Sequence, residues 1–236
     1  MENVYKLICV PFAGGSSKSY LKWRSVIDPR IELIFYEMAG RGTRQNEKNM
    51  HTMEELIHDL VYFIENTADN EHRISIFGHS MGAYVFYEAY ESLSKDVKTK
   101  IDYIFLSGAV SLKYIIASPV WNQILLPKDE FLNVVEMHGW VQKEILRRDS
   151  VRDYIYRVMK HDFSLMNNYI WTMKKINMYS QVYILYGQED IYQVEQYYSW
   201  KENIEAPLYY WGFKGNHFFI LDQYQEVVET INRILL

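Results

Sequence analysis

The sequence predicts an α/β protein with a mostly parallel central sheet and helices on both of its faces. Three observations point to this class: short apolar runs bounded by glycine or proline, helical patterns between them, and a length of 236 residues. That length suits one domain with a sizeable core. The runs are typical of strands buried on both faces, and their alternation with helices favours parallel pairing.

Six segments have the length and composition of buried strands, and five of them end at or beside glycine or proline. They are Tyr5–Val10, Ile31–Tyr36, Ile74–Phe77, Tyr103–Leu106, Val182–Tyr186 and Leu208–Trp211. Amphipathic spacing predicts helices over three further segments. These are Met53–Glu65, Ala83–Leu93 and Tyr224–Leu236.

The alternation stops over residues 112–177, where the pattern is helical and no strand is expected. Four helices are predicted there, at Lys128–Met137, Val141–Arg148, Val151–Met159 and Phe163–Met173. Ser150 and Asp153 have the spacing of a capping box at the start of the third. We therefore expect a single domain over residues 1–236 with a helical insertion at 112–177. Its position favours a lid over an active site, and long crossover helices are the alternative.

The composition excludes several classes of protein. The net charge is −5 and no long basic run is present, so nucleic acid is a poor candidate partner. No apolar stretch approaches the ~18–20 residues that span a bilayer, and the N-terminus lacks a signal-peptide pattern. The one cysteine, Cys9, lies in an apolar run and is expected to be buried. We expect a cytoplasmic protein without a membrane partner.

A candidate nucleophile follows the third predicted strand. Gly78-His79-Ser80-Met81-Gly82 has the pattern G-x-S-x-G between a strand and a helix, the context of the nucleophile elbow of α/β hydrolases. Glycines on either side remove side chains that would collide with the neighbouring strand and helix. The turn presents the Ser80 hydroxyl to the pocket and places the Met81 N–H, at the start of the helix, where an oxyanion forms.

A serine hydroxyl needs a base, and in this fold the order along the chain is serine, acid, histidine. Four of the seven histidines precede or adjoin Ser80, and two lie in the insertion: His51, His58, His72, His79, His138 and His161. His217 remains, in the loop after the last predicted strand. Asp190 and Glu189 both follow the strand Val182–Tyr186, and the position three residues after Gly187 favours Asp190.

The second oxyanion donor is expected in Pro11–Ser16, the loop after the first strand. Its glycines let the backbone approach a substrate closely, and it lacks the Gly-Lys-Ser/Thr ending of a phosphate-binding P-loop. We assign the donor N–H to Phe12, with Ala13 as the alternative. This set of residues predicts a serine hydrolase that needs no metal and no cofactor.

With these residues in place, the sequence resembles the type II thioesterases of nonribosomal peptide and polyketide synthesis, nearly from end to end. The matching segments are Pro11-Phe12-Ala13-Gly14-Gly15-Ser16, Gly40-Arg41-Gly42-Thr43-Arg44, Gly78-His79-Ser80-Met81-Gly82, Gly187–Asp190, Gly215-Asn216-His217-Phe218-Phe219 and His161-Asp162-Phe163. One departure is Ala39, which stands where the family usually has proline.

The resemblance implies an α/β-hydrolase fold and the hydrolysis of acyl thioesters on the phosphopantetheine arm of acyl or peptidyl carrier proteins. It also implies a monomer. Arg41 is a candidate for the phosphate of the arm, with a surface or structural ion pair as the alternative. Asp162 is a candidate for the acyl or pantetheine group, with a lid helix cap or a salt bridge as the alternative. The residues alone leave two rivals open: a lidded esterase or lipase acting on free small esters, and a silent α/β-hydrolase fold used as a binding module.

Overall fold

A six-stranded parallel sheet organises the computed structural model, which describes residues 5–138, 140–141 and 145–236. The strand order is β2-β1-β3-β4-β6-β8, and every neighbouring pair runs parallel. The strands are β1 (Tyr5–Val10), β2 (Ile31–Phe35), β3 (Arg73–His79), β4 (Ile101–Ser107), β6 (Gln181–Gly187) and β8 (Leu208–Phe213). All six predicted strands are confirmed.

Side chains that alternate along the strands build two separate cores, one on each face of the sheet. In β1, Ile8 and Val10 pack into one core, whereas Leu7 and Cys9 pack into the other. The other buried strands alternate in the same way, which is why the runs are apolar without interruption. Cys9 is fully buried, as expected, and burial raises the pKa of its thiol.

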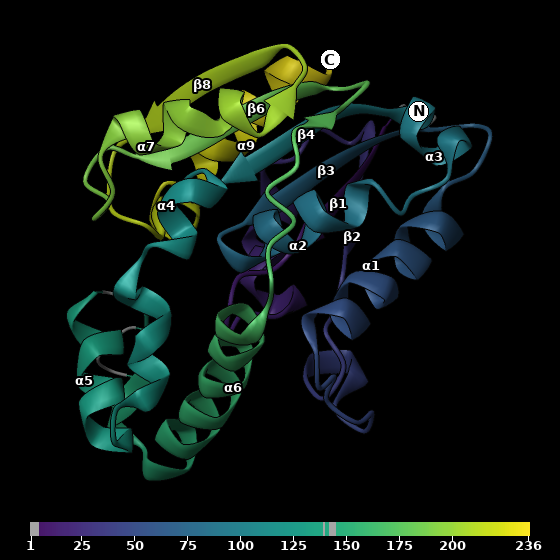
Figure 1. The fold of residues 1–236 in the computed structure, drawn as a ribbon. Helices are drawn as coiled ribbons and strands as arrows, with labels where there is room; N and C mark the ends of the chain where they lie inside the picture. The colour runs from purple at the N-terminus through teal and green to yellow at the C-terminus, as the bar shows by residue number, and fades with distance from the viewer. Residues whose placement is uncertain (1–4, 139, 142–144) are drawn as a thin grey trace.

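Helices cover both faces of the sheet (Figure 1). The helices α1 (Met53–Thr67) and α2 (Met81–Tyr90) pack on the face that carries Ile8. The C-terminal helix α9 (Tyr224–Leu235) and the 3-10 helix η1 (Ser17–Ser25) pack on the opposite face. Short helices α3 (Lys95–Lys100), α7 (Val194–Tyr198) and α8 (Phe219–Asp222) lie in connections, with 3-10 turns η2 (Gly42–Arg44) and η5 (Ser199–Glu202).

The segment after β4 is helical, as predicted. It contains α4 (Leu112–Ile116), η3 (Pro119–Leu125), α5 (Lys128–Met137), η4 (Ile145–Arg147) and α6 (Asp149–Asn168). Figure 1 shows α5 and α6 as a pair that stands off from the sheet. The expectation of no strand over residues 112–177 is wrong at its end, where the two-residue strand β5 (Ile176–Asn177) pairs with β7 (Ile204–Glu205). Of the predicted helix Val141–Arg148, residues 142–144 lie outside the described part of the chain.

Two predicted helices in this segment are one in the structure. The predicted break between Met159 and Phe163 is wrong, because α6 runs without interruption from Asp149 to Asn168 and ends before Met173. The capping box is also wrong: Arg148 occupies the N-cap, without a side-chain hydrogen bond to the helix end, and Ser150 is already helical. Asp162 lies within this helix and is buried, where it pairs with Arg41 from a remote segment.

The ladder between β3 and β4 contains one irregularity, far from the carboxyl end of β3. Ile74 is paired with Ile101 but Ser75 is paired with Tyr103, so Asp102 is an extra residue on β4. From Ser75 onward the register is unbroken as far as His79, which lies opposite Ser107. Such a bulge absorbs one residue without shifting the rest of the strand pair.

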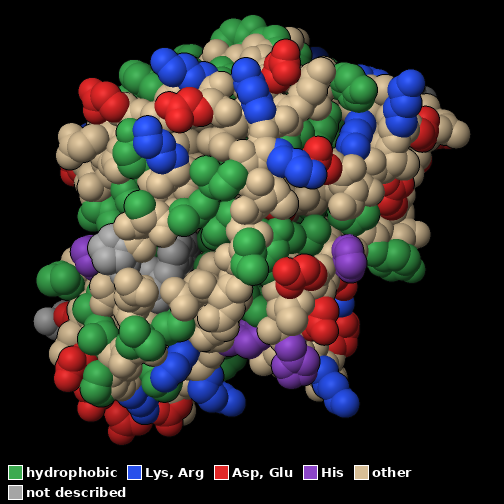
Figure 2. All heavy atoms as spheres, viewed as in Figure 1, with side chains coloured by type: hydrophobic (Ala, Val, Ile, Leu, Met, Phe, Trp, Pro, Cys, Tyr) green, Lys and Arg blue, Asp and Glu red, His purple; other side chains and the backbone are tan. Residues whose placement is uncertain are grey.

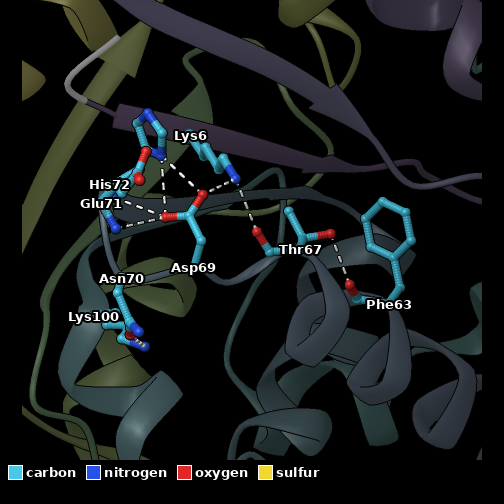
Figure 3. A network of polar contacts seen from close by, with 8 residues as sticks. All are labelled: Lys6, Phe63, Thr67, Asp69, Asn70, Glu71, His72 and Lys100. Carbon is cyan, nitrogen blue, oxygen red and sulfur yellow. Dashed lines mark hydrogen bonds and ion pairs between the residues drawn. The ribbon is translucent and has the colours of Figure 1, made fainter. Parts of the chain in front are cut away.

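The turn between α1 and β3 is held by the carboxylate of Asp69 (Figure 3). Asp69 accepts hydrogen bonds from the backbone N–H groups of Glu71 and His72 at 3.0 and 2.9 Å. Lys6 on β1 forms an ion pair with Asp69 at 2.5 Å and also donates to the Thr67 carbonyl. These bonds tie the end of α1 to the start of the sheet.

Surface charge is mixed on the face that Figure 2 shows, where Lys and Arg alternate with Asp and Glu and form no continuous basic area. Within the part of the chain that the structure describes, no helix combines the length and apolar character needed to cross a membrane.

Candidate active site

Ser80 lies on a sharp turn between β3 and α2 and has a strained backbone. Its φ of 51° and ψ of −119° are rare for a residue with a side chain. The Ser80 N–H donates to the Ser107 carbonyl at 2.7 Å, and the Ser80 carbonyl accepts from Ala83 N–H at 3.0 Å. The turn is therefore held by the neighbouring strand β4 and by the first turn of α2, as the G-x-S-x-G pattern predicts.

The two glycines of the pattern are required by close backbone contacts. A Cβ at Gly82 would lie 2.3 Å from the Val10 carbonyl oxygen at the end of β1. A Cβ at Gly78 would lie 2.7 Å from Cα of Ala83. Both separations are far shorter than a van der Waals contact, so only glycine lets α2 approach the sheet closely enough to carry Ser80 at this angle.

His217 is hydrogen-bonded to Asp190, as the sequence predicts. The distance from His217 Nδ1 to Asp190 Oδ2 is 2.9 Å, and the Asp190 side chain is fully buried. Glu189, the alternative acid, is exposed. Because a carboxylate oxygen only accepts, Nδ1 carries the proton, and Nε2 of the neutral ring is left as the acceptor. A histidine in this tautomer can act as a general base.

Backbone hydrogen bonds join the loop of the acid to the loop of the histidine. Gln188 N–H donates to the Phe213 carbonyl at 2.8 Å, and Glu189 N–H donates to the Gly215 carbonyl at 2.9 Å. These bonds continue the β6–β8 pairing beyond the end of β6. The relative position of Asp190 and His217 is therefore set by the sheet itself.

The carboxylate of Asp190 has two further donors, and the sequence analysis found neither. Tyr197 on α7 donates its hydroxyl to Asp190 Oδ2 at 2.7 Å, and Ile191 N–H donates to Oδ1 at 2.6 Å. Burial by itself would raise the pKa of Asp190, but the charge of His217 and these hydrogen bonds hold it below its usual value. Asp190 is therefore ionised at neutral pH.

A narrow apolar pocket contains both Ser80 and His217. Its free volume of about 40 Å³ has room for roughly three water molecules. Other described residues that line it are Phe12, Ala13, Tyr84, Gly108, Ile115, Val120, Trp140, Met159, Phe163, Ile191, Tyr192 and Phe218. A larger groove of about 450 Å³ shares Phe12, Ala13, Trp140, Met159 and Phe218 with it. The two spaces are adjacent, with these side chains between them.

Of the expected oxyanion donors, Phe12 and Ala13 line the same pocket, and Met81 directly follows Ser80 in the chain. Met81 is the first residue of α2, and the first N–H groups of a helix have no acceptor within the helix. Phe12 and Ala13 both line the pocket, so the structure leaves the choice between their N–H groups open.

His79 packs beside His217 and lies in the core, as expected for a residue next to the elbow. The two ring centroids are 5.1 Å apart, and His79 Nδ1 is 2.9 Å from the Ser107 hydroxyl. Burial, and to a smaller extent the nearby charge of His217, lowers the pKa of His79 well below its ordinary value. His79 is thus a neutral packing partner.

Arg41 and Asp162 lie together, 121 residues apart in the sequence, and form a buried ion pair. Two hydrogen bonds join them, from Arg41 Nη1 to Asp162 Oδ2 at 2.7 Å and from Nη2 to Oδ1 at 2.5 Å. The exposed fractions of the two side chains are 3% and 0%. The pair matches the structural ion pair considered for Arg41 and the salt bridge considered for Asp162, and contact of either residue with a substrate stays a prediction.

The parallel sheet, the turn at Ser80 and the joined acid and histidine loops define the α/β-hydrolase fold. A solved structure of ClbQ from the colibactin NRPS/PKS pathway has the same fold, with a TM-score of 0.81 and 24% sequence identity. The match covers 98% of this chain and 96% of that chain.

A model of the thioesterase domain matches residues 5–235, so the chain belongs to the thioesterase domain family. Thioesterase PikA5 of Streptomyces venezuelae is 24% identical over 238 residues, covering 100% of this chain and 82% of that protein. The medium-chain S-acyl fatty acid synthase thioesterase of Homo sapiens is 23% identical over 232 residues, covering 95% of this chain and 84% of that protein.

Proposed function

We propose that this chain is a type II thioesterase of nonribosomal peptide or polyketide synthesis. It hydrolyses acyl groups from the phosphopantetheine arm of carrier proteins, with Ser80 as nucleophile, His217 as base and Asp190 as the acid that orients it. The observation that carries the proposal is the hydrogen bond between His217 Nδ1 and the buried Asp190 carboxylate, in the pocket that also contains Ser80. The family match and the similarity to PikA5 support the thioester substrate.

In the first half of the reaction His217 Nε2 takes the Ser80 proton while Ser80 Oγ attacks the thioester carbonyl. The N–H groups of Met81 and of Phe12 or Ala13 stabilise the negative charge on the carbonyl oxygen. As the C–S bond breaks, His217 returns the proton to the departing pantetheine sulfur, and the acyl group remains on Ser80.

In the second half, His217 takes a proton from water, and the hydroxide attacks the acyl-serine. The carboxylic acid leaves when His217 returns the proton to Ser80 Oγ. Asp190 stays ionised throughout and stabilises the imidazolium that forms twice in each turnover.

The lid and the partner are part of this proposal. Residues 112–177 act as a lid on the single domain 1–236, since Ile115, Val120 and Phe163 from this segment line the Ser80 pocket. The narrowness of that pocket favours short acyl groups. The protein is further proposed to be a cytoplasmic monomer. It acts on acyl or peptidyl carrier proteins and needs no metal or cofactor.

The proposal is tested with carrier protein loaded with acetyl and other short acyl groups, followed by intact-protein mass. Wild type should release the acyl group, Ser80→Ala should not, and Ser92→Ala is the matched control because Ser92 is exposed at the end of α2. If wild type leaves the carrier protein loaded but cleaves free p-nitrophenyl esters through Ser80, the function is that of an esterase. If Ser80 fails to react with a fluorophosphonate probe, the chain is a binding module.

A second candidate comes from the human relative, whose name assigns it to fatty acid synthase. Medium-chain acyl groups would need more room than the 40 Å³ beside Ser80, such as the adjacent groove of about 450 Å³. Comparison of acetyl-, hexanoyl- and decanoyl-loaded carrier proteins separates the two. A rate that falls steeply with chain length supports the type II thioesterase function, and a rate that rises supports the fatty acid role.

A further inference from the structure

A tight turn in the loop after β1 carries both candidate oxyanion donors. Gly15 N–H donates to the Phe12 carbonyl at 2.8 Å, which closes a four-residue turn from Phe12 to Gly15. Gly14 has a φ of +79°, in the region that glycine adopts readily. The direction of the Phe12 and Ala13 N–H groups therefore depends on the shape of this turn.

The turn is bonded to the insertion helix α6. Asp162 Oδ2 accepts the Gly14 N–H at 2.7 Å. One helical turn earlier, Met159 packs so closely that a Cβ at Gly14 would lie 2.6 Å from its Cγ. Residues three apart share a face of a helix, so α6 meets the turn with one apolar and one charged side chain.

Arg41 completes the contact from a third segment. The same Arg41 Nη1 that donates to Asp162 also donates to the Gly15 carbonyl at 3.2 Å. The peptide groups on both sides of the Gly14–Gly15 linkage are thus bonded to one buried ion pair. Burial alone would raise the pKa of Asp162, but the charge of Arg41 lowers it, so the carboxylate is an ionised acceptor.

A second carboxylate, from the segment after β2 and outside the insertion, anchors the loop just beyond the turn. Glu37, which follows β2, accepts the Ser17 N–H at 3.2 Å and the Ser17 hydroxyl at 2.5 Å. The loop is therefore held at one point by the sheet region and at another by the insertion.

We propose that Asp162, held by Arg41, is a positioning residue for the oxyanion hole, and that α6 fixes the turn from which Phe12 or Ala13 donates. This inference rests on the proposed function, because it assigns a role to the same pocket. Movement of α6 away from the sheet would remove the Asp162 acceptor of Gly14 N–H and the packing of Met159 against Gly14 at the same time. Closure of the insertion and formation of the oxyanion hole are then a single event.

The test uses the double variant Arg41→Met/Asp162→Leu, which removes both buried charges together. Replacement of a whole buried ion pair by apolar side chains is commonly tolerated, whereas removal of one partner is not. The control is Arg73→Met/Asp102→Leu, an ion pair that joins the start of β3 to the start of β4, at the end of this strand pair opposite Ser80. For each, kcat and KM on p-nitrophenyl acetate, the melting temperature and the Ki of a trifluoromethyl ketone are measured.

The expected result is a fall in kcat of about 10–100-fold in the Arg41/Asp162 double variant, since a displacement near 1 Å costs on the order of 100-fold. The ketone forms a tetrahedral adduct with Ser80, so its Ki should rise by a similar factor while KM changes less than about twofold. The control should keep its kcat. A purely structural ion pair would lower the melting temperature and leave kcat and Ki of the folded fraction unchanged, which would overturn the proposal.

Asp162→Glu decides the matter if the double variant does not fold. Glutamate keeps the charge for Arg41 but reaches one methylene further, so it displaces the acceptor for Gly14 N–H. A loss of kcat at an unchanged melting temperature supports the positioning role, and full activity refutes it. All these readouts use a free ester, so a wild type that cleaves the ester but ignores loaded carrier protein refutes the proposed function and leaves this inference standing.

Discussion

Tyr197→Phe removes one oxygen atom from the surroundings of Asp190 and keeps the shape of the side chain. The lost contact is the 2.7 Å hydrogen bond to Oδ2, the oxygen that also accepts from His217. A hydrogen bond to a charged group contributes about 1.5–3 kcal/mol. For a chain of this length, each kcal/mol lost lowers the melting temperature by about 2–4 °C, so a fall of about 3–12 °C is expected at pH 7.

The pH dependence gives the sharper measurement. The pKa of Asp190 is below its usual value in the folded protein, so its ionised form stabilises the fold above the unfolded pKa of ~3.9, and this is lost as pH falls through the folded pKa. Without Tyr197 the folded pKa rises towards the usual value. The stability difference between wild type and variant should therefore be full at pH 7 and shrink in acid.

Denaturant titrations at pH 7 and near pH 3, with kcat measured at pH 7, test this reasoning. If the missing hydrogen bond destabilises the transition state by ~1.4 kcal/mol more than the enzyme–substrate complex, kcat falls about tenfold. Tyr186→Phe is a suitable control, because Tyr186 stacks on Tyr197 at 5.2 Å without a bond to Asp190. Equal stability of wild type and Tyr197→Phe at pH 7 would refute the role given to this hydroxyl.

Two further predictions concern titratable groups within or beside the insertion. Burial raises the pKa of Glu88, which accepts from Tyr169 and Thr172, so its ionised form costs stability as pH rises above ~4.3. Glu88→Gln should melt about 2 °C higher than wild type at pH 7 and show no gain at pH 4; a lower melting temperature at pH 7 would contradict the reasoning. His161 lies between two acceptors, Asp162 Oδ1 at 3.1 Å and the Met50 carbonyl at 2.7 Å, and its hydrogen bond to Asp162 raises its pKa. The doubly protonated form of His161 stabilises the fold below the unfolded pKa of ~6.5, and this stabilisation is lost as pH rises through the folded pKa. In denaturant titrations, His161→Gln should therefore cost about 1 kcal/mol of unfolding free energy at pH 6 and less at pH 9. A cost that does not depend on pH would rule out this role of His161.

The strands and the hydrogen-bonded acid and histidine were predictable because their signals are local. A buried parallel strand is an apolar run that stops at Gly or Pro, and the loops that follow β3, β6 and β8 carry Ser80, Asp190 and His217. These side chains meet because parallel strands bring their carboxyl ends to one edge of the sheet.

Contacts made at a distance were not predictable. Tyr197 lies in a five-residue helix, and nothing in its neighbourhood in the sequence marks it as a donor to Asp190. The break predicted in α6 has the same origin. Asp162 is tolerated inside a buried helix face because Arg41 and Gly14, both remote in the sequence, donate hydrogen bonds to its carboxylate.

The extra residue Asp102 marks a place where the chain can gain or lose a residue without disturbing the rest of the sheet. Strand β3 alternates between two cores and leads directly into Ser80, so one residue inserted between Ser75 and His79 would exchange the faces of Ile76 and Phe77. That exchange would place each side chain in the wrong core and destabilise the fold, whatever its effect on catalysis. At the opposite end of the same strand pair, the bulge already accommodates an unmatched residue. Single-residue insertions and deletions in relatives should therefore collect at the amino end of β4, while the stretch from Ser75 to Ser80 keeps a constant length.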